Sequence, residues 1–108
     1  MWGVCLGSEA VQEGFYQKVI QYRVDENGEV VITLPKTIFK PYIRHIKELS
    51  MSPKYIYDQK VSPCNHPDII GVVCDIGWHF KLNCYFYKIR VNGKVKSKRY
   101  YDYDLNFI

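Results

Sequence analysis

The stretch Cys84-Tyr-Phe-Tyr-Lys-Ile-Arg-Val-Asn-Gly-Lys-Val-Lys-Ser-Lys98 contains the strongest structural signal in this chain. Its first eight residues are mainly aromatic and β-branched, with charges at alternating positions, which is typical of a strand with one buried face. Asn92-Gly93 follows, and this dipeptide favours a tight hairpin turn because both residues tolerate positive φ. We therefore predict a β-hairpin with strands over residues 84–91 and 94–101.

Alternation along this hairpin predicts a core face and a charged face, because successive side chains of a strand point to opposite sides. The predicted core residues are Tyr85, Tyr87, Ile89 and Val91. The predicted outer patch consists of five cations, Lys88, Arg90, Lys94, Lys96 and Lys98. Such a patch attracts phosphate groups or an acidic protein surface, although lysines near a sheet edge also serve simply to prevent aggregation.

Outward from the hairpin, residues 53–108 are predicted to be β-structure throughout. Strands are expected at 55–61 and 69–78, with a proline-containing loop at 62–68 between them and a last strand at 105–108. Five short strands with tight turns favour a small closed barrel, in which the last strand pairs with the first, because closure removes exposed edges.

Residues 1–52 are predicted to form an extension that packs with this barrel as one compact unit. A second hairpin is expected over residues 15–34, with Asp25-Glu-Asn-Gly28 as its turn. A short helix is expected over residues 41–49, since Pro41 suits a first helical position and apolar residues follow at helical spacing. The predicted fold class is α+β, mostly β, with a five-stranded barrel at 53–108 preceded by a β-hairpin and one short helix.

Length and composition exclude several classes of protein. The chain has 108 residues, 47% of them hydrophobic, and a formal charge of +4, which rules out a multi-domain enzyme and a disordered chain. Residues 76–101 contain seven cations and no acid, so this basic stretch carries +7 and the remainder −3. Aromatic residues make up 16%, more than a core of this size buries, so some rings are expected to face solvent or a partner.

The compartment expected for this chain is the cytoplasm. Its first residues carry no basic charge, and no apolar run approaches the roughly 20 residues of a membrane-spanning helix. In that reducing compartment the four cysteines are expected to be free thiols, Cys5, Cys64, Cys74 and Cys84.

No residue pattern predicts catalysis or a metal site. Cys64, His66 and Asp68 are close enough to form a nucleophilic set, but the prolines around them account equally well for the loop. The cysteines and histidines between residues 64 and 84 lack the paired spacing of a structural zinc site. We predict a non-enzymatic protein with no cofactor and no metal.

A second candidate for contact is the cluster Trp78-His79-Phe80-Lys81 at the end of a predicted strand. Exposed rings next to cations stack on RNA bases or anchor a protein interface. The alternative is that Trp78 and Phe80 cap the open end of the barrel.

Residues 53–108 resemble the SH3-like barrel superfold. Gly71-Val-Val-Cys-Asp-Ile76 is similar to the opening strand of KOW and Tudor-type members, and Asp102–Ile108 is similar to their short helical turn and last strand. The resemblance implies a barrel topology, which by itself indicates no function because such barrels serve many.

Residues 69–108 also resemble small bacterial SH3-like proteins, some of them similar to immunity proteins of polymorphic toxin systems. The segments that carry this resemblance are Trp78-His-Phe-Lys81, Val91-Asn-Gly-Lys94 and Ser97-Lys-Arg-Tyr-Tyr101. It implies a cytoplasmic protein that binds a cognate toxin domain and neutralises it. Two other functions remain open: RNA binding by the basic hairpin, and a homo-oligomeric scaffold such as a homodimer.

Overall fold

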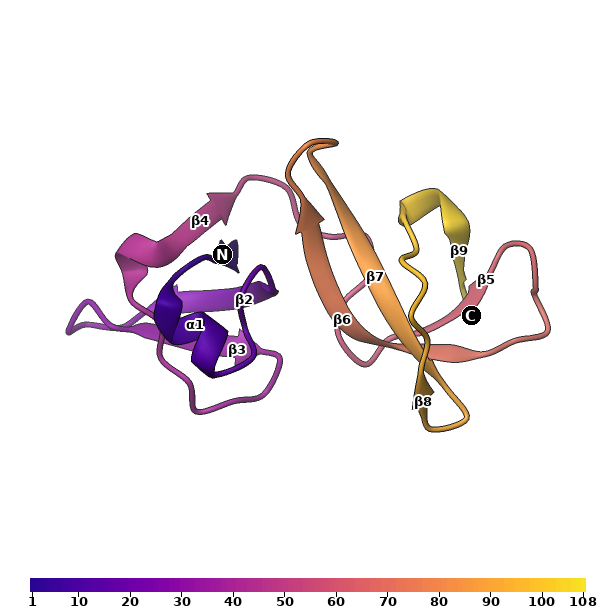
Figure 1. Cartoon of the computed structure of the whole chain (residues 1–108), viewed down its shortest axis with the longest axis horizontal. Helices are drawn as coiled ribbons and strands as arrows, with labels where there is room; N and C mark the ends of the chain where they lie inside the picture. Colours follow the sequence, from indigo (N-terminus) through magenta and orange to yellow (C-terminus); the bar gives the residue numbers. More distant parts are fainter. The chain divides into compact units, whose positions relative to one another are not determined.

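The computed structural model describes all residues, 1–108, and divides them into two compact units, Met1–Ser52 and Pro53–Ile108. We call these unit 1 and unit 2. Each contains one antiparallel sheet, so the chain is mostly β, and α1, Ser8–Gln12, is its one short α-helix (Figure 1). None of its helices has the length and apolar character needed to cross a bilayer.

Unit 1 contains a four-stranded sheet in the order β3-β2-β1-β4 (Figure 1). The strands are β1 Trp2–Cys5, β2 Val19–Val24, β3 Val30–Leu34 and β4 Ile46–Leu49. The core of the unit consists of Cys5, Ala10, Ile20, Tyr22, Val30 and Ile32. Because Ala10 belongs to α1, the short helix packs directly on the buried side of the sheet.

The predicted hairpin of unit 1 is confirmed in its strand pairing, with Val24 opposite Val30. Its turn is built around Asp25, whose Oδ1 accepts hydrogen bonds of 2.9 Å from the backbone N–H groups of Asn27 and Glu29. Only Gly28 adopts a positive φ, 78°, so the Asn-Gly pair forms a longer turn than predicted.

The helix predicted over residues 41–49 is wrong. The structure has a single 3-10 turn, η1 Ile43–His45, followed by β4. β4 pairs with β1 along its whole length, from Cys5 opposite Ile46 to Trp2 opposite Leu49. The hydrogen bonds and packing that β4 gains by pairing with β1 outweigh the weak local preference of these residues for helix. The helical spacing of the apolar residues does not reveal this pairing, because β1 is distant in the sequence.

Unit 2 contains a five-stranded sheet in the order β8-β7-β6-β5-β9. Its strands are β5 Lys60–Pro63, β6 Gly71–His79, β7 Cys84–Val91, β8 Lys94–Val95 and β9 Leu105–Phe107, with a 3-10 turn, η2 Asp102–Asp104, before the last (Figure 1). The last strand pairs with the first strand of the unit, as predicted. The predicted closed barrel is not confirmed, because β8 and β9 both remain edge strands.

Two strand predictions in unit 2 were too long or misplaced. After Lys96 the chain leaves the ladder and returns only at a single bridge between Tyr100 and Tyr87, so the strand expected over 94–101 is mostly irregular. The strand expected over 55–61 begins instead at Lys60, because a positive φ of 69° at Asp58 turns the backbone out of the ladder direction.

The core of unit 2 is rich in tyrosine. The predicted core residues Tyr85, Tyr87 and Ile89 are buried, whereas Val91 is only partly buried. Tyr55 is also buried, and its ring meets that of Tyr87 edge-on at 5.3 Å. Its hydroxyl donates a 2.7 Å hydrogen bond to the carbonyl of Leu105. Buried hydroxyls with partners let large rings fill this core without stranding polar groups.

Candidate functional site

The most exposed apolar feature near the predicted site is the turn between β6 and β7, residues 80–83, which we call the hairpin tip. Phe80 is 38% exposed and Leu82 60% exposed, with Lys81 between them. The backbone N–H of Leu82 donates a 3.1 Å hydrogen bond to His79 Nδ1, and Asn83 adopts a positive φ of 52°. This bond and the left-handed residue define the backbone of the turn, from which Phe80 and Leu82 project with much of their surface in solvent.

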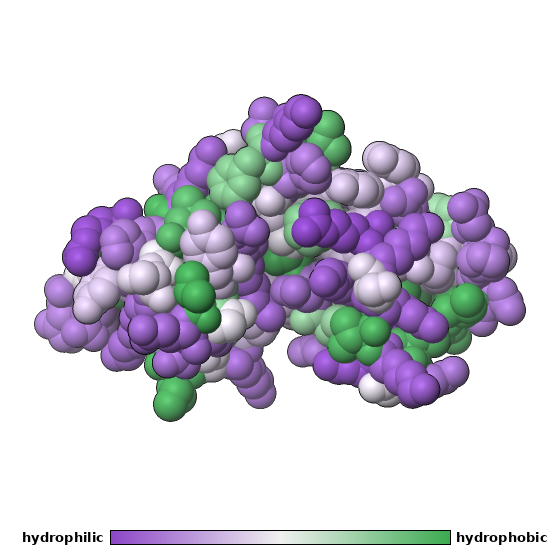
Figure 2. All heavy atoms as spheres, viewed as in Figure 1, coloured by the Kyte–Doolittle hydropathy of each residue, from purple (hydrophilic) through white to green (hydrophobic).

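Figure 2 shows hydrophobic and strongly hydrophilic side chains together at the far end of the β6–β7 hairpin. Turns are normally polar, so two large, partly exposed apolar side chains at such a position form a candidate contact surface.

Trp78 belongs to the core side of the sheet and not to the hairpin tip. It lies opposite Tyr85, and the two rings meet edge-on with centroids 4.9 Å apart. Trp78 is partly buried, and its buried Nε1–H has no hydrogen-bond acceptor. Of the predicted cluster, His79 therefore positions the tip, and Phe80 and Lys81 are its exposed members.

On the outer side of the same sheet, a guanidinium group lies over an aromatic ring. The ring of Phe86 lies over Gly77, directly opposite on β6, where an added Cβ would collide with it. The Arg99 guanidinium carbon lies 4.2 Å from the centroid of the Phe86 ring. We call this contact the Phe86–Arg99 platform. Neither residue was predicted to be a contact residue, although alternation along the strand places Phe86 on the same side as Lys88 and Arg90.

The predicted five-cation patch does not form as a single face. Val95 is the residue opposite Arg90, and Lys94 is opposite Val91. Because directly opposed residues in an antiparallel sheet project to the same side, Lys94 and Lys96 lie on the side of Val91 and Ile89. Alternation within each strand does not decide which side the two strands share; the two-residue turn Asn92-Gly93 decides it by placing Val91 opposite Lys94.

The outer face instead carries Lys88 and Arg90, joined by Arg99. Lys88 lies directly opposite Asp75, which offsets part of its charge. The cations of the basic stretch are thus distributed over both sides of the β7–β8 hairpin. They form a positively charged border on both sides of this hairpin, which we call the positive rim, and not one positively charged face.

Lys98 lines a small cleft of about 130 Å³. Its ammonium group is 5.0 Å from the centroid of the Tyr100 ring. The cleft also contains Cys64 and His66, two members of the nucleophilic set considered above. The Cys64 thiol donates to the carbonyl of Tyr103 at 3.4 Å, so it does not point at an imidazole as a base-activated nucleophile would.

The titratable groups that the fold perturbs are buried structural ones. Burial raises the pKa of Cys5 to about 11, with a smaller effect from Glu9. Burial likewise raises the pKa of Tyr85 to about 12 and, together with a hydrogen bond to Asp102, raises that of Tyr87 further. No group of three or more His, Cys, Asp or Glu side chains is arranged to hold a metal ion, and all four cysteines are free.

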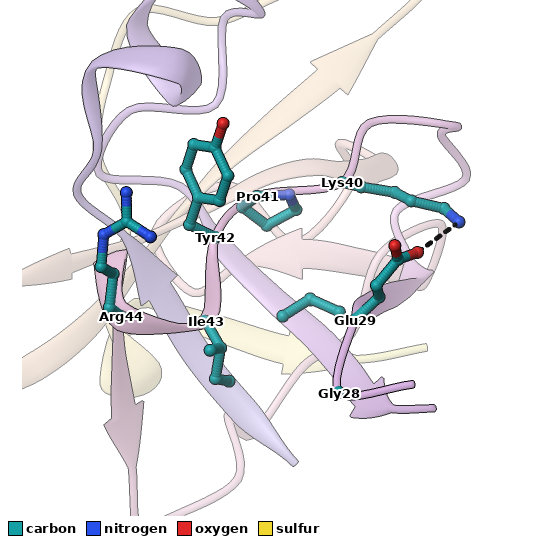
Figure 3. A pocket seen from close by; sticks show the side chains of 8 residues that line it. Gly28, Glu29, Lys40, Pro41, Tyr42, Ile43 and Arg44 are labelled. Atoms are coloured by element: carbon teal, nitrogen blue, oxygen red, sulfur yellow. Dashed lines mark hydrogen bonds and ion pairs between the residues drawn. The ribbon is translucent and has the colours of Figure 1, made fainter. Parts of the chain in front are cut away.

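A larger cleft, of about 220 Å³, lies in unit 1. It runs between the turn that precedes β3 and the segment 40–44 (Figure 3). Its charged side chains include Lys40, which forms a 3.2 Å ion pair with Glu29, and Arg44, whose guanidinium carbon lies 4.5 Å from the centroid of the Tyr42 ring. The cleft was not predicted, because residues 41–49 were expected to form a helix.

Comparison of the chain with known protein families, with curated proteins and with solved structures finds no match. The residues and geometry above are therefore the basis of the functional argument.

Proposed function

We propose that this protein is a non-catalytic inhibitor, an immunity protein that binds and neutralises a cognate bacterial toxin domain through unit 2. The observation that carries the proposal is the hairpin tip, where Phe80 and Leu82 are exposed in a turn held by the Leu82–His79 hydrogen bond. A pre-organised pair of apolar side chains at the end of a rigid hairpin is suited to fill a pocket on a partner protein.

The charge of the basic stretch bears on the chemistry of the partner away from the tip, because Lys81 is the only charged residue of the tip and the other cations follow along β7, β8 and the segment after them. The basic stretch, residues 76–101, contains no acid, and its cations surround both sides of the β7–β8 hairpin. Such a positive rim accelerates association with an acidic surface and disfavours basic surfaces. We therefore propose a partner with an apolar pocket for the tip and an acidic surface facing the β7–β8 hairpin, and not the basic active site of a nuclease.

For unit 2 itself we propose an SH3-like fold that is open between β8 and β9. What supports this is the strand order β8-β7-β6-β5-β9, with a 3-10 turn directly before the last strand and that strand paired with the first. In this interpretation the long β6–β7 hairpin is a projecting element of the fold, which is where small β domains commonly carry their binding residues.

The test is binding and neutralisation with matched variants. If the neighbouring gene encodes a toxin domain, that domain would be produced with this protein, and affinity would be measured by calorimetry together with protection of cells from the toxin. We expect Phe80→Ala combined with Leu82→Ala to weaken binding by about 30-fold or more and to abolish protection.

The matched control removes two equally exposed apolar side chains of the same unit, Ile56 and Ile70, which are 44% and 58% exposed. We expect Ile56→Ala with Ile70→Ala to bind and protect like the wild type. Equal losses in both double variants, or no binding by the wild type, would refute the proposal.

RNA binding is the second candidate, and the Phe86–Arg99 platform is the observation that favours it. An arginine stacked on an aromatic ring offers a flat cationic surface on which a base can stack, and Lys88 and Arg90 lie on the same side of the sheet. Salt-sensitive binding of single-stranded oligonucleotides, lost in Arg99→Gln but retained in the Phe80 and Leu82 double variant, would select RNA binding over inhibition. Self-association without either partner would select a scaffold.

A further inference from the structure

The cleft of unit 1 is a second candidate binding site, and its walls combine apolar and charged residues. Val30 is only 1% exposed and lines it, as does the buried Pro41. Tyr42 and Ile43, 55% and 46% exposed, contribute the more accessible part. At about 220 Å³ the cleft is smaller than sites for drug-sized ligands, so it has room for about one side chain.

The charges in the cleft leave one cation available. The Lys40 ammonium is 3.2 Å from Glu29 Oε2, so these two groups neutralise each other. Arg44 contacts the Tyr42 ring and not a carboxylate, so its fork of N–H donors stays available to a ligand. Figure 3 shows Tyr42 and Arg44 side by side, with the Lys40–Glu29 pair on the opposite side of the cleft.

We propose that this cleft binds the C-terminal residue of a protein partner, with its apolar side chain against the cleft wall and its carboxylate on Arg44. A planar guanidinium is suited to receive a carboxylate through two parallel hydrogen bonds. The Tyr42 ring beneath the guanidinium restricts its motion, which lowers the entropy cost of that contact.

The small size of the cleft is the reason for choosing a terminal residue over an internal acidic segment. The apolar wall and the single available cation lie in one cleft of about 220 Å³. A ligand therefore needs its carboxylate and its apolar side chain on the same residue, which a peptide chain offers only at its C-terminus. If an internal Asp or Glu supplied the carboxylate, the apolar side chain would have to come from a neighbouring residue, and the two residues together would need a longer groove. This site lies in unit 1 and is independent of the function proposed for unit 2.

N-acetyl-L-leucine is the probe, because it has the apolar side chain and carboxylate of a C-terminal residue and little else. Titration into the full chain would be followed by amide chemical shifts in ¹H–¹⁵N spectra. We expect shifts at Gly28, Val30, Ile43 and Arg44 that saturate with a dissociation constant of about 1–10 mM, as befits so small a ligand. N-acetyl-L-leucinamide, which lacks the carboxylate, is expected to bind at least about tenfold more weakly.

Variants assign the carboxylate contact. Arg44→Gln is expected to reduce the affinity for N-acetyl-L-leucine about tenfold, to the level of the amide, while Lys36→Gln removes an exposed cation outside the cleft and is expected to change nothing. The same spectra report whether each variant is folded. Equal binding of acid and amide, no saturable shift at these residues, or unchanged affinity in Arg44→Gln would each overturn the proposal.

Discussion

The hydroxyl of Tyr87 donates a 2.9 Å hydrogen bond to Asp102 Oδ1, which connects β7 to the turn η2 that precedes the last strand. The same hydroxyl accepts a 3.0 Å hydrogen bond from the backbone N–H of Lys54, at the beginning of the unit. One fully buried side chain thus connects three segments that are far apart in the sequence. This arrangement makes Tyr87 the residue on which the order of unit 2 most depends.

Replacing this hydroxyl should destabilise unit 2 and leave its shape intact. In Tyr87→Phe the ring remains, but the Lys54 N–H and an oxygen of Asp102 lose a partner, which costs about 1–3 kcal/mol. Urea unfolding followed by Trp78 fluorescence, in a Trp2→Phe background, would report on unit 2 alone. The control is Tyr103→Phe, at a position that is 78% exposed, for which we expect no measurable change.

The same tyrosine network predicts a loss of stability at high pH. The pKa values of Tyr85 and Tyr87 are raised above the ordinary value of 10.0, to about 12 for Tyr85, mainly by burial. A raised pKa in the folded state means that the unfolded state releases the proton first. The stabilisation is therefore complete below pH 10 and is lost as the pH rises above it, by up to about 1.4 kcal/mol per pH unit for each tyrosine.

The measurement is the free energy of unfolding of unit 2 between pH 8 and 12, in the Trp2→Phe background. Tyr85→Phe should show a shallower decline than its parent above pH 10. A stability that is flat up to pH 12, or a slope that Tyr85→Phe does not change, would contradict the assignment.

The fit of Phe86 over Gly77 predicts a non-additive pair of substitutions. Gly77→Ala places a methyl group where the Phe86 ring lies, and we expect a loss of about 1–3 kcal/mol from the shift that follows. Combining it with Phe86→Ala should remove the collision, so the double variant should be more stable than the sum of the two single losses predicts. A double-mutant cycle by urea unfolding measures this coupling, and strict additivity would argue against the contact.

The hydrogen-bonded contact between Glu9 and His45 should stabilise unit 1. His45 Nδ1 lies 2.8 Å and 2.9 Å from the two carboxylate oxygens of Glu9, and it connects α1 to η1 in a partly buried position. We expect Glu9→Gln to cost about 1 kcal/mol in thermal or urea unfolding of unit 1. Glu13→Gln removes an exposed carboxylate just after the same helix and should have no effect beyond error.

The cysteines should differ strongly in reactivity. Cys5 is 1% exposed and burial raises its pKa to about 11, whereas Cys64 is exposed on the loop after β5. Because only the accessible thiolate reacts, iodoacetamide at pH 8 should modify Cys64 at least about 100-fold faster than Cys5. Mass spectrometry of digested samples over time measures both rates. Similar rates in the native protein would show that unit 1 opens readily, and urea should abolish the difference.

Local sequence signals correctly predicted features that depend on interactions within a few residues, namely a hairpin turn and the buried face of a strand. At Asn92-Gly93 both residues adopt positive φ, 50° and 78°, so the turn chemistry alone located the β7–β8 hairpin. The alternation that made Tyr85, Tyr87 and Ile89 the buried face was confirmed for the same reason, since it depends on pleating and hydrophobicity within one strand.

The candidate site was predicted less completely than the fold. Phe80 and Lys81 are exposed at a strand end, which is one of the two alternatives that the sequence left open, whereas Leu82 was placed only in a connection between strands and was not considered as a contact residue. Arg99 was counted only as charge. Its contact with Phe86 forms because the chain leaves the β7–β8 ladder after Lys96 and returns to β7 near Tyr100. The pattern of residue types does not predict this path of the chain.

The amino-acid sequence by itself determined the two hairpin turns, the tyrosine-rich core face of unit 2 and the separation of positive charge into residues 76–101. These features follow from backbone preferences and polarity within short segments. Only the tertiary structure decided that residues 46–49 form a strand against β1 and that Tyr42 and Arg44 border a cleft. Each of these depends on pairing between segments distant in the chain, where the free energy of a shared ladder or core outweighs local propensity.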